Sequence, residues 1–248
     1  MTDSITTAAV RIEGAGRDQV EAYLARPTDP GARGGVVLIH HMPGYDRWSK
    51  EVVRRFATDG YDVVMPNLYW REAPGADPDD AAAVARSSGG VPDERLLGDV
   101  AGAAAYLRAL DSSNGKVGVI GHCSGGRQAV LAACNLDLDA AVDCYGAYVV
   151  GAPPEDHPLH SRMRGFEDQL AKLGCPLLGL FGNDDAHPSP DEVAVLDRLL
   201  TEHGKEHQFH AYDGAGHAFF GTDRPSYRVD AAVDGYRRIG EFFARHLG

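Results

Sequence analysis

The sequence predicts an α/β fold with a mainly parallel central β-sheet and helices on both of its faces. Short apolar segments of strand length alternate along the chain with amphipathic segments of helical period. Nearly continuous apolar strands are typical of parallel strands, because crossover helices cover both faces of such a sheet. The chain has 248 residues, of which 44% are hydrophobic. We therefore expect a single domain over residues 1–248.

The N-terminal half of the chain is expected to contain five strands and three helices. A Gly-Ala-Gly turn at residues 14–16 separates the first two strands, and Pro66 ends the fourth. Val52, Val53 and Phe56 share one face of the first helix. The expected strands are residues 8–12, 19–24, 35–39, 61–65 and 116–120. The expected helices are residues 47–59, 79–86 and 95–110.

The C-terminal half repeats the same alternation. An apolar segment of about strand length precedes each helical segment, with Gly, Pro, Asn or Asp residues between them. The expected strands are residues 140–145, 176–181 and 207–212. The expected helices are residues 128–134, 165–172, 191–203 and 228–246.

Charge and composition narrow the classes of partner. The formal net charge is −12, which disfavours nucleic acid and anionic membranes as binding partners. The chain begins without the basic and apolar segments of a secretory signal, and its apolar stretches are too short to span a bilayer. Its four cysteines show no CxxC spacing, as expected for free thiols in a reducing compartment. We expect a soluble cytoplasmic protein that acts on a small molecule.

One hexapeptide, Gly121-His122-Cys123-Ser124-Gly125-Gly126, carries the strongest chemical signal. It has the form G-x-C-x-G between an apolar strand and a helical segment, which is typical of a nucleophile elbow. Small residues flank the nucleophile of such a turn because its strained backbone leaves little room. The pattern predicts that Cys123 is a nucleophile. The remaining three cysteines are expected to be small buried hydrophobes: Cys134, Cys144 and Cys175.

Ligands of open α/β sheets bind beyond the carboxyl ends of the strands, so catalytic residues are expected just after strands. Four segments meet this condition: 40–44, 121–126, 182–185 and 214–217. A thiol nucleophile needs a base, and the base needs an orienting acid. His217 is the expected base, and the residues alone leave Asp184 and Asp185 nearly equal as the acid, although Asp185 could instead fix its own turn.

Two groups of neighbouring side chains could also be interpreted as metal ligands. They are His40, His41 and Asp46, and the group of Asp184, Asp185 and His187. Neither has a recognised metal-ligand spacing. We therefore expect no metal site and no cofactor.

With these motifs the chain resembles the dienelactone hydrolase (carboxymethylenebutenolidase) family of α/β-hydrolases. Besides the cysteine elbow, the resemblance rests on residues 113–118 (SNGKVG), 66–71 (PNLYWR) and 213–219 (DGAGHAF). It implies the α/β-hydrolase fold, a monomer, and hydrolysis of a carboxylic ester or lactone without a cofactor. It implies Cys123 as nucleophile, His217 as base and Asp185 as acid. It also implies an oxyanion hole formed by the backbone N–H groups of Met42 and Ser124.

Two positions depart from the family pattern. His41 stands where well-studied members carry a glutamate that interacts with the resting cysteine, so we hypothesise that His41 forms an ion pair with Cys123. Phe219-Phe220-Gly221 stands where dienelactone-specific members carry an arginine for the substrate carboxylate.

The second departure bears on the substrate. Met42, Trp70, Phe219 and Phe220 suggest an apolar pocket for the acyl group. Tyr145, just past a strand, is a further candidate for its lining, although an aromatic residue there is more often part of the core. The alternatives are a general small-ester or thioester hydrolase and, in a different class, a non-catalytic ligand-binding or redox-sensing protein on the same scaffold.

Overall fold

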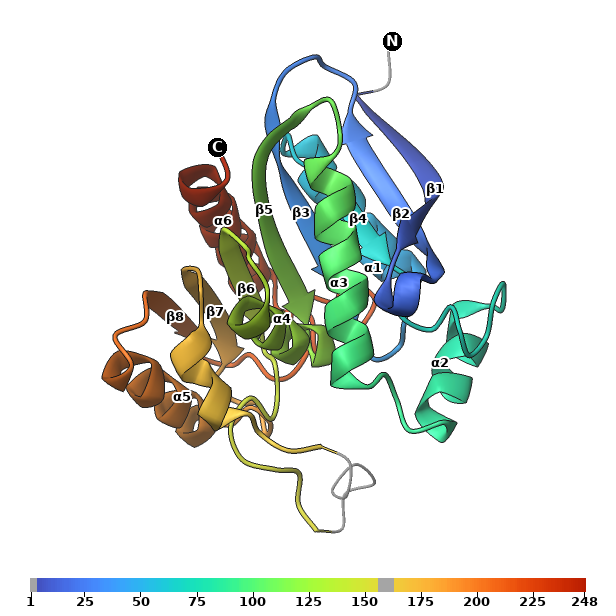
Figure 1. Cartoon of the computed structure of the whole chain (residues 1–248). Coiled ribbons are helices and arrows are strands. Elements are labelled where there is room, and N and C mark those ends of the chain that lie inside the picture. The colour runs from blue at the N-terminus through green and yellow to red at the C-terminus, as the bar shows by residue number, and fades with distance from the viewer. Residues whose placement is uncertain (1–3, 156–162) are drawn as a thin grey trace.

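The computed structural model describes residues 4–155 and 163–248. Its eight strands form one sheet in the order β1-β2-β4-β3-β5-β6-β7-β8 (Figure 1). β1 and β2 pair antiparallel, β2 and β4 also pair antiparallel, and every pair from β4 to β8 is parallel. The sequence-based prediction of a mainly parallel α/β sheet is therefore confirmed.

All eight expected strands are present, with ends that differ by a few residues from those predicted. β5 is the most extended relative to its prediction, because it pairs with β3 on one side and β6 on the other. The strands are β1 (Ile5–Glu13), β2 (Gln19–Pro27), β3 (Arg33–Ile39), β4 (Asp62–Pro66), β5 (Ser113–His122), β6 (Ala140–Cys144), β7 (Leu177–Gly182) and β8 (His207–Tyr212).

Six of the seven expected helices are α-helices: α1 (Arg47–Thr58), α2 (Pro78–Ser87), α3 (Asp93–Arg108), α4 (Ser124–Asn135), α5 (Pro190–Glu202) and α6 (Val229–His246). The expected helix at residues 165–172 is instead a 3₁₀ helix, η2 (Glu167–Lys172), and a shorter one, η1 (Ala15–Arg17), lies between β1 and β2. In η2 only Leu170 is buried, so the segment lacks the apolar face that stabilises longer α-helices.

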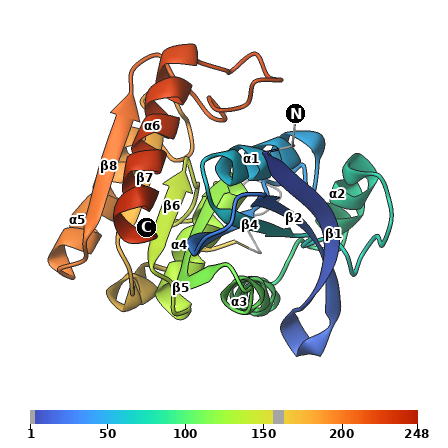
Figure 2. The same ribbon diagram turned by 90° about the horizontal axis from the view of Figure 1, so that it is seen from above.

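The helices divide between the two faces of the sheet, and each face has its own apolar core. α3, α4 and α5 pack against one face, where Val100, Val130 and Leu200 are buried with the side chains of β3 and β5. α1 and α6 cover the opposite face through residues that include Phe56 and Phe243. Figure 2 shows α1 and α6 on one side of the sheet and α3 on the other. None of the helices in residues 4–155 and 163–248 combines the length and apolar character needed to span a bilayer.

The turn between β5 and α4 is strained and tightly packed. Cys123 has φ 57° and ψ −123°, a conformation that costs a non-glycine residue about 1 to 3 kcal/mol. A Cβ atom on Gly125 would lie 2.3 Å from the carbonyl oxygen of Ile39, and one on Gly121 would lie 2.0 Å from the carbonyl oxygen of Gly125. Gly121 and Gly125 are therefore required, because a Cβ atom at either position would overlap fixed backbone atoms.

We predict that Gly125→Ala lowers the free energy of unfolding by roughly 2 to 3 kcal/mol, because the added methyl group meets fixed backbone of β3. The matched control is Gly240→Ala in α6, where no atom lies within 4 Å of the added Cβ. That change should raise stability by up to about 1 kcal/mol through helix propensity. Urea unfolding of the two variants measures the difference, and equal effects would contradict the packing argument.

Candidate active site

The three residues predicted for the triad come together at the carboxyl edge of the sheet. Cys123 occupies the N-cap position of α4, Asp185 follows β7, and His217 follows β8. Nδ1 of His217 lies 2.8 Å from Oδ2 of Asp185. The thiol of Cys123 is near enough to help raise the pKa of His217. One imidazole thus lies between a thiol and a carboxylate, which is the arrangement that acyl-transfer triads use.

The structure distinguishes the two adjacent aspartates. Asp185 is buried, and its second oxygen accepts a hydrogen bond from the backbone N–H of His187 at 3.0 Å. Asp184 is exposed to solvent. The carboxylate that contacts His217 is therefore that of Asp185.

Burial lowers the pKa of His217, but hydrogen bonds with Asp185 and Cys123 and the charges of both partners outweigh burial and raise it to about 10. The protonated imidazolium is therefore favoured near neutral pH whenever the thiol is ionised. Cys123 also lies at the N-terminus of α4, where the peptide dipoles stabilise a thiolate.

The other three cysteines have a different environment. Cys134, Cys144 and Cys175 are all buried, as expected from the sequence, whereas Cys123 is partly exposed. Burial raises the pKa of the Cys134 thiol to about 11 and that of Cys175 to about 12. Burial also raises the pKa of Cys144. The thiol with access to solvent is therefore the one at the elbow.

The loop after β3 is held by an arrangement that the sequence did not predict. The backbone N–H of Leu68 donates to Nε2 of His40 at 3.2 Å, so the ring proton of His40 is on Nδ1. Nδ1 donates to the carbonyl oxygen of His41 at 2.9 Å, and that oxygen also accepts from the N–H of Gly44 at 2.9 Å.

The carbonyl of His41 and the N–H of Met42 belong to the same planar peptide and point in opposite directions. Fixing the carbonyl therefore fixes the direction of the N–H group predicted for the oxyanion hole. The hydroxyl of Tyr69 donates to the carbonyl of Met42 at 2.8 Å and holds the next peptide as well. The sequence indicated His40 as part of the segment 40–44 after a strand and of a possible metal-ligand group, and Tyr69 only as part of a family motif.

His41 has a partner other than the one hypothesised. Its Nε2 lies 2.7 Å from Oδ2 of Asp46, and its ring packs on Trp48 with centroids 5.1 Å apart. Burial raises the pKa of Asp46, but hydrogen bonds from His41 and Ser49 outweigh it and lower the pKa to about 2. Asp46 is held beside His41 because its other carboxylate oxygen accepts a hydrogen bond from the N–H of Ser49 and so caps the N-terminus of α1. No hydrogen bond among the described residues joins His41 to Cys123, and their ion pair stays a prediction.

The aromatic residues suggested for an acyl pocket lie in different parts of the structure. The guanidinium of Arg11 lies 3.9 Å above the ring of Trp70, on the β1 side of the sheet, and Trp70 does not line the cavity described below. Phe219 is fully buried and stacked on Phe220 at 4.7 Å. Tyr145 is also buried, and its ring meets that of His217 at 5.2 Å. Phe219 and Tyr145 therefore support the loop of His217 from the core.

Two buried titratable groups lie directly under the elbow. Nε2 of His122 has no hydrogen-bond partner in the described structure, and aromatic rings of Trp48 and Phe220 surround it. Burial lowers the pKa of His122 to about 3. Asp143, opposite Gly121 in the sheet, accepts from the N–H of Gly146 at 2.7 Å, and burial raises its pKa to about 7. An aspartate inside the apolar segment 140–145 was the sequence signal for this second group.

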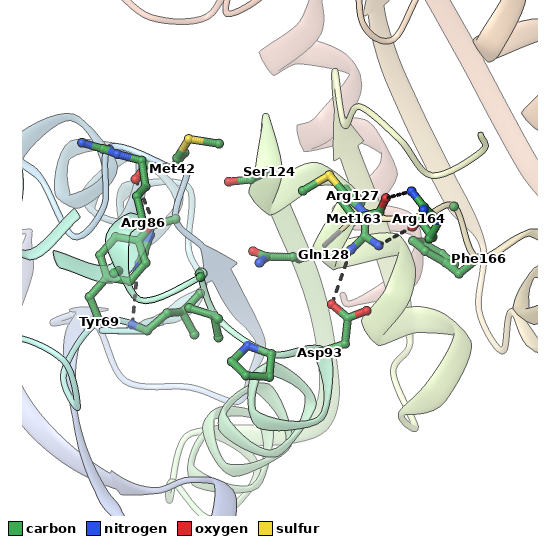
Figure 3. A pocket seen from close by; sticks show the side chains of 18 of the residues that line it. Met42, Tyr69, Arg86, Asp93, Ser124, Arg127, Gln128, Met163, Arg164 and Phe166 are labelled. Carbon is green, nitrogen blue, oxygen red and sulfur yellow. Dashed lines mark hydrogen bonds and ion pairs between the residues drawn. The ribbon is translucent and has the colours of Figure 1, made fainter. Parts of the chain in front are cut away.

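A cavity of about 830 Å³ opens beside the triad. Met42 and Ser124, the two residues predicted to supply the oxyanion hole, are in its wall, whereas Cys123, Asp185 and His217 are not (Figure 3). The proposed oxyanion hole therefore lies between the triad and the cavity. Among the described residues no group of three or more His, Cys, Asp or Glu side chains could hold a metal ion.

Comparison with known proteins finds relatives that match most of the chain. A sequence profile described as "Dienelactone hydrolase family" matches residues 20–247. The protein named "Putative carboxymethylenebutenolidase" in Salmonella typhimurium strain LT2 is 32% identical over 237 residues, covering 93% of this chain and 84% of the relative. The protein of the same name in Escherichia coli K12 is 31% identical over 252 residues, covering 99% and 89%.

Solved structures give the same result. The crystal structure of the "Putative Dienelactone Hydrolase" from Klebsiella pneumoniae matches with a TM-score of 0.84 and 28% identity. The match covers 98% of this chain and 100% of the Klebsiella chain.

We predict that His122→Phe makes the protein less sensitive to acid. The pKa of His122 is lowered in the folded state, so its contribution to stability is present above pH 6.5 and is lost as the pH falls toward 3. Between pH 7 and pH 5 the variant should lose about 2 kcal/mol less of its free energy of unfolding than the wild type. Urea unfolding at both pH values measures this. The exposed His203, changed to Gln, is the control, and equal losses in His122→Phe and wild type would contradict the prediction.

Proposed function

Because the chain belongs to the dienelactone hydrolase family, and is therefore a hydrolase, we propose that it cleaves a carboxylic ester or lactone through an acyl-cysteine intermediate. The observation that carries the proposal is the hydrogen bond between His217 and Asp185 at the sheet edge where the strained elbow holds Cys123, whose thiol helps raise the pKa of His217. We propose Cys123 as nucleophile, His217 as general base and acid, and Asp185 as the residue that orients His217.

In the first step of the proposed reaction, the Cys123 thiolate attacks the ester carbonyl and forms a C–S bond. The negative charge that develops on the carbonyl oxygen is stabilised by the backbone N–H groups of Met42 and Ser124, each worth about 3 kcal/mol. The C–O bond to the leaving group then breaks, and the imidazolium of His217 supplies its proton. A lactone gives a ring-opened acyl group in the same step.

In the second step, neutral His217 takes a proton from water, and the resulting hydroxide attacks the thioester carbonyl. The C–S bond breaks, the carboxylic acid product leaves, and the thiolate–imidazolium pair is restored. Asp185 stabilises the imidazolium and keeps the proton of Nδ1 toward itself, so that Nε2 faces the substrate.

The oxyanion hole is the part of this mechanism that depends most on a fixed backbone. His40, Gly44 and Tyr69 together hold the peptides on both sides of Met42 before any substrate arrives. Such preorganisation avoids reorganisation of the donors during the reaction.

A general small-ester or thioester hydrolase is the second candidate. It is favoured by Phe219, Phe220 and Gly221, since the two phenylalanines are buried and offer no cation to a substrate carboxylate after His217. One domain over residues 1–248, a monomeric state and a cytoplasmic location stay predictions from the sequence.

The proposed mechanism predicts that Cys123→Ala abolishes hydrolysis of nitrophenyl esters and of dienelactone without changing the unfolding transition. Wild-type enzyme quenched during turnover should carry the acyl group on the tryptic peptide that contains Cys123, as measured by mass spectrometry. Turnover by Cys123→Ala at the wild-type rate, or an adduct on another cysteine, would rule out the mechanism.

The assignment of the acid is tested by two isosteric changes at adjacent positions. Asp185→Asn should reduce kcat by roughly 10³-fold or more, because the amide no longer favours the required tautomer and charge of His217. Asp184→Asn, which alters an exposed side chain, should leave kcat within about 2-fold. Initial rates with a nitrophenyl ester separate the two, and similar kcat values for both variants would overturn the assignment.

A further inference from the structure

Apart from the oxyanion loop and Ser124, the cavity is formed by segments that take no part in the proposed chemistry. Its walls come from the end of α2, the loop to α3, the first turns of α4 and the segment before η2. Figure 3 shows Met42, Tyr69 and Arg86 on one side of it and Arg127, Met163 and Phe166 on the other. Any substrate whose carbonyl oxygen reaches Met42 and Ser124 meets the mouth of this cavity.

The cavity is large and mainly apolar at its base. Leu68, Ala85 and Phe166 are buried in the hydrophobic core and present carbon atoms to the space, with Val91 and Pro92 beside them. Cavities of roughly 300 to 1,000 Å³ hold drug-sized ligands, and this one is in the upper part of that range. A simple lactone would leave most of it filled with water.

The position of His217 determines which part of the ester can enter the cavity. The leaving oxygen lies beside His217 when it takes its proton, and His217 is not in the cavity wall. The oxyanion residues are in the wall. The acyl portion therefore extends from the carbonyl group into the cavity, away from His217.

Gln128 provides a polar group at a defined place in this space. It follows Ser124 by four residues on α4, so the two side chains lie on one face of the helix, about 5 to 6 Å apart at Cβ. Its Oε1 is shielded from solvent and has no hydrogen-bond partner among the described residues. Figure 3 shows the carboxamide between Ser124 and the opposite wall. A buried amide oxygen without a partner costs about 1 to 3 kcal/mol, which a ligand group could relieve.

The charged residues of the wall are of both signs: Arg86, Arg127 and Arg164, with Asp93 and Asp168. The guanidinium of Arg127 donates to the backbone oxygens of Tyr148 and Arg164 and approaches Asp93 at 3.5 Å. Asp168 also lines the cavity. Arg86, at the opposite wall, is exposed and has no ion pair within the described residues. A neutral hydrogen-bonding group suits Gln128 best, and a hydroxyl can either donate to or accept from a carboxamide.

We propose that this cavity binds a bulky, mainly apolar acyl group, much larger than a simple lactone, and that Gln128 hydrogen bonds with a hydroxyl group on it. The inference rests on the proposed esterase function and names its substrate class. The acyl group enters past Met42 and Ser124, and its hydroxyl lies about one helical turn from the carbonyl carbon.

Three nitrophenyl esters test the size of the acyl group and its hydroxyl: the acetate, the phenylpropanoate and the meta-hydroxyphenylpropanoate. The phenylpropanoate should exceed the acetate in kcat/KM by at least 10-fold in the wild type. Val91→Trp, which fills the cavity, should reduce this ratio to near unity. Val84→Trp, on the exposed face of α2, is the matched control and should keep the wild-type ratio.

Gln128→Leu tests the hydrogen bond. The hydroxylated ester should exceed the phenylpropanoate in the wild type, and the variant should lower that ratio by roughly 10-fold while unfolding at the wild-type urea concentration. A ratio that Gln128→Leu leaves unchanged would refute the role of Gln128. A preference for an anionic carboxyphenylpropanoate ester that Arg86→Gln abolishes would assign the cavity to an anion and overturn the proposal.

The acetate separates the two levels of inference. If the wild type hydrolyses none of the three esters, or if Cys123→Ala still hydrolyses them, the proposed function fails. If the acetate is hydrolysed through Cys123 but the larger esters show no advantage, only the inference about the cavity fails.

Discussion

The close packing of the elbow against its two neighbouring strands is the constraint on which the rest of the site depends. Cys123 keeps a conformation with positive φ because Gly125 touches the backbone of β3 and the N–H of Cys123 donates to the carbonyl of Cys144 on β6. The same contacts direct the first N–H groups of α4 toward the edge of the sheet. The position of the thiol and the position of the Ser124 N–H, one of the two proposed oxyanion donors, therefore depend on the same packing.

The second proposed oxyanion donor, the N–H of Met42, depends on a different kind of constraint. Its peptide is fixed by hydrogen bonds to its carbonyl group, from the ring of His40 and the N–H of Gly44. Burial lowers the pKa of His40 to about 4, which keeps the ring neutral and preserves its two different nitrogen roles near neutral pH. Steric contact thus holds one donor, and a buried neutral imidazole holds the other.

Sequence patterns were sufficient for the sheet and for six of the seven helices, because strand period, glycine spacing and strand ends are local properties. They also predicted His217 and one of two aspartates at the same sheet edge, but the choice of Asp185 over Asp184 came from the family resemblance. They were not sufficient for Trp70 and Tyr69, which are adjacent in the chain but point to different parts of the molecule. The partner of His41 and the hydrogen bonds of His40 depend on tertiary contacts over 5 to 28 residues. Such contacts leave no periodic signal.

The separation of the cavity from the triad has a consequence for how such enzymes diversify. The triad residues sit on the elbow and on the turns after β7 and β8, whereas most of the cavity wall comes from residues 85–93 and 163–169. Insertions or substitutions in those wall segments can remodel the bound group while the strained turn and its glycines stay unaltered. Within one scaffold, selection can therefore act on substrate range and on bond-breaking chemistry as nearly independent traits.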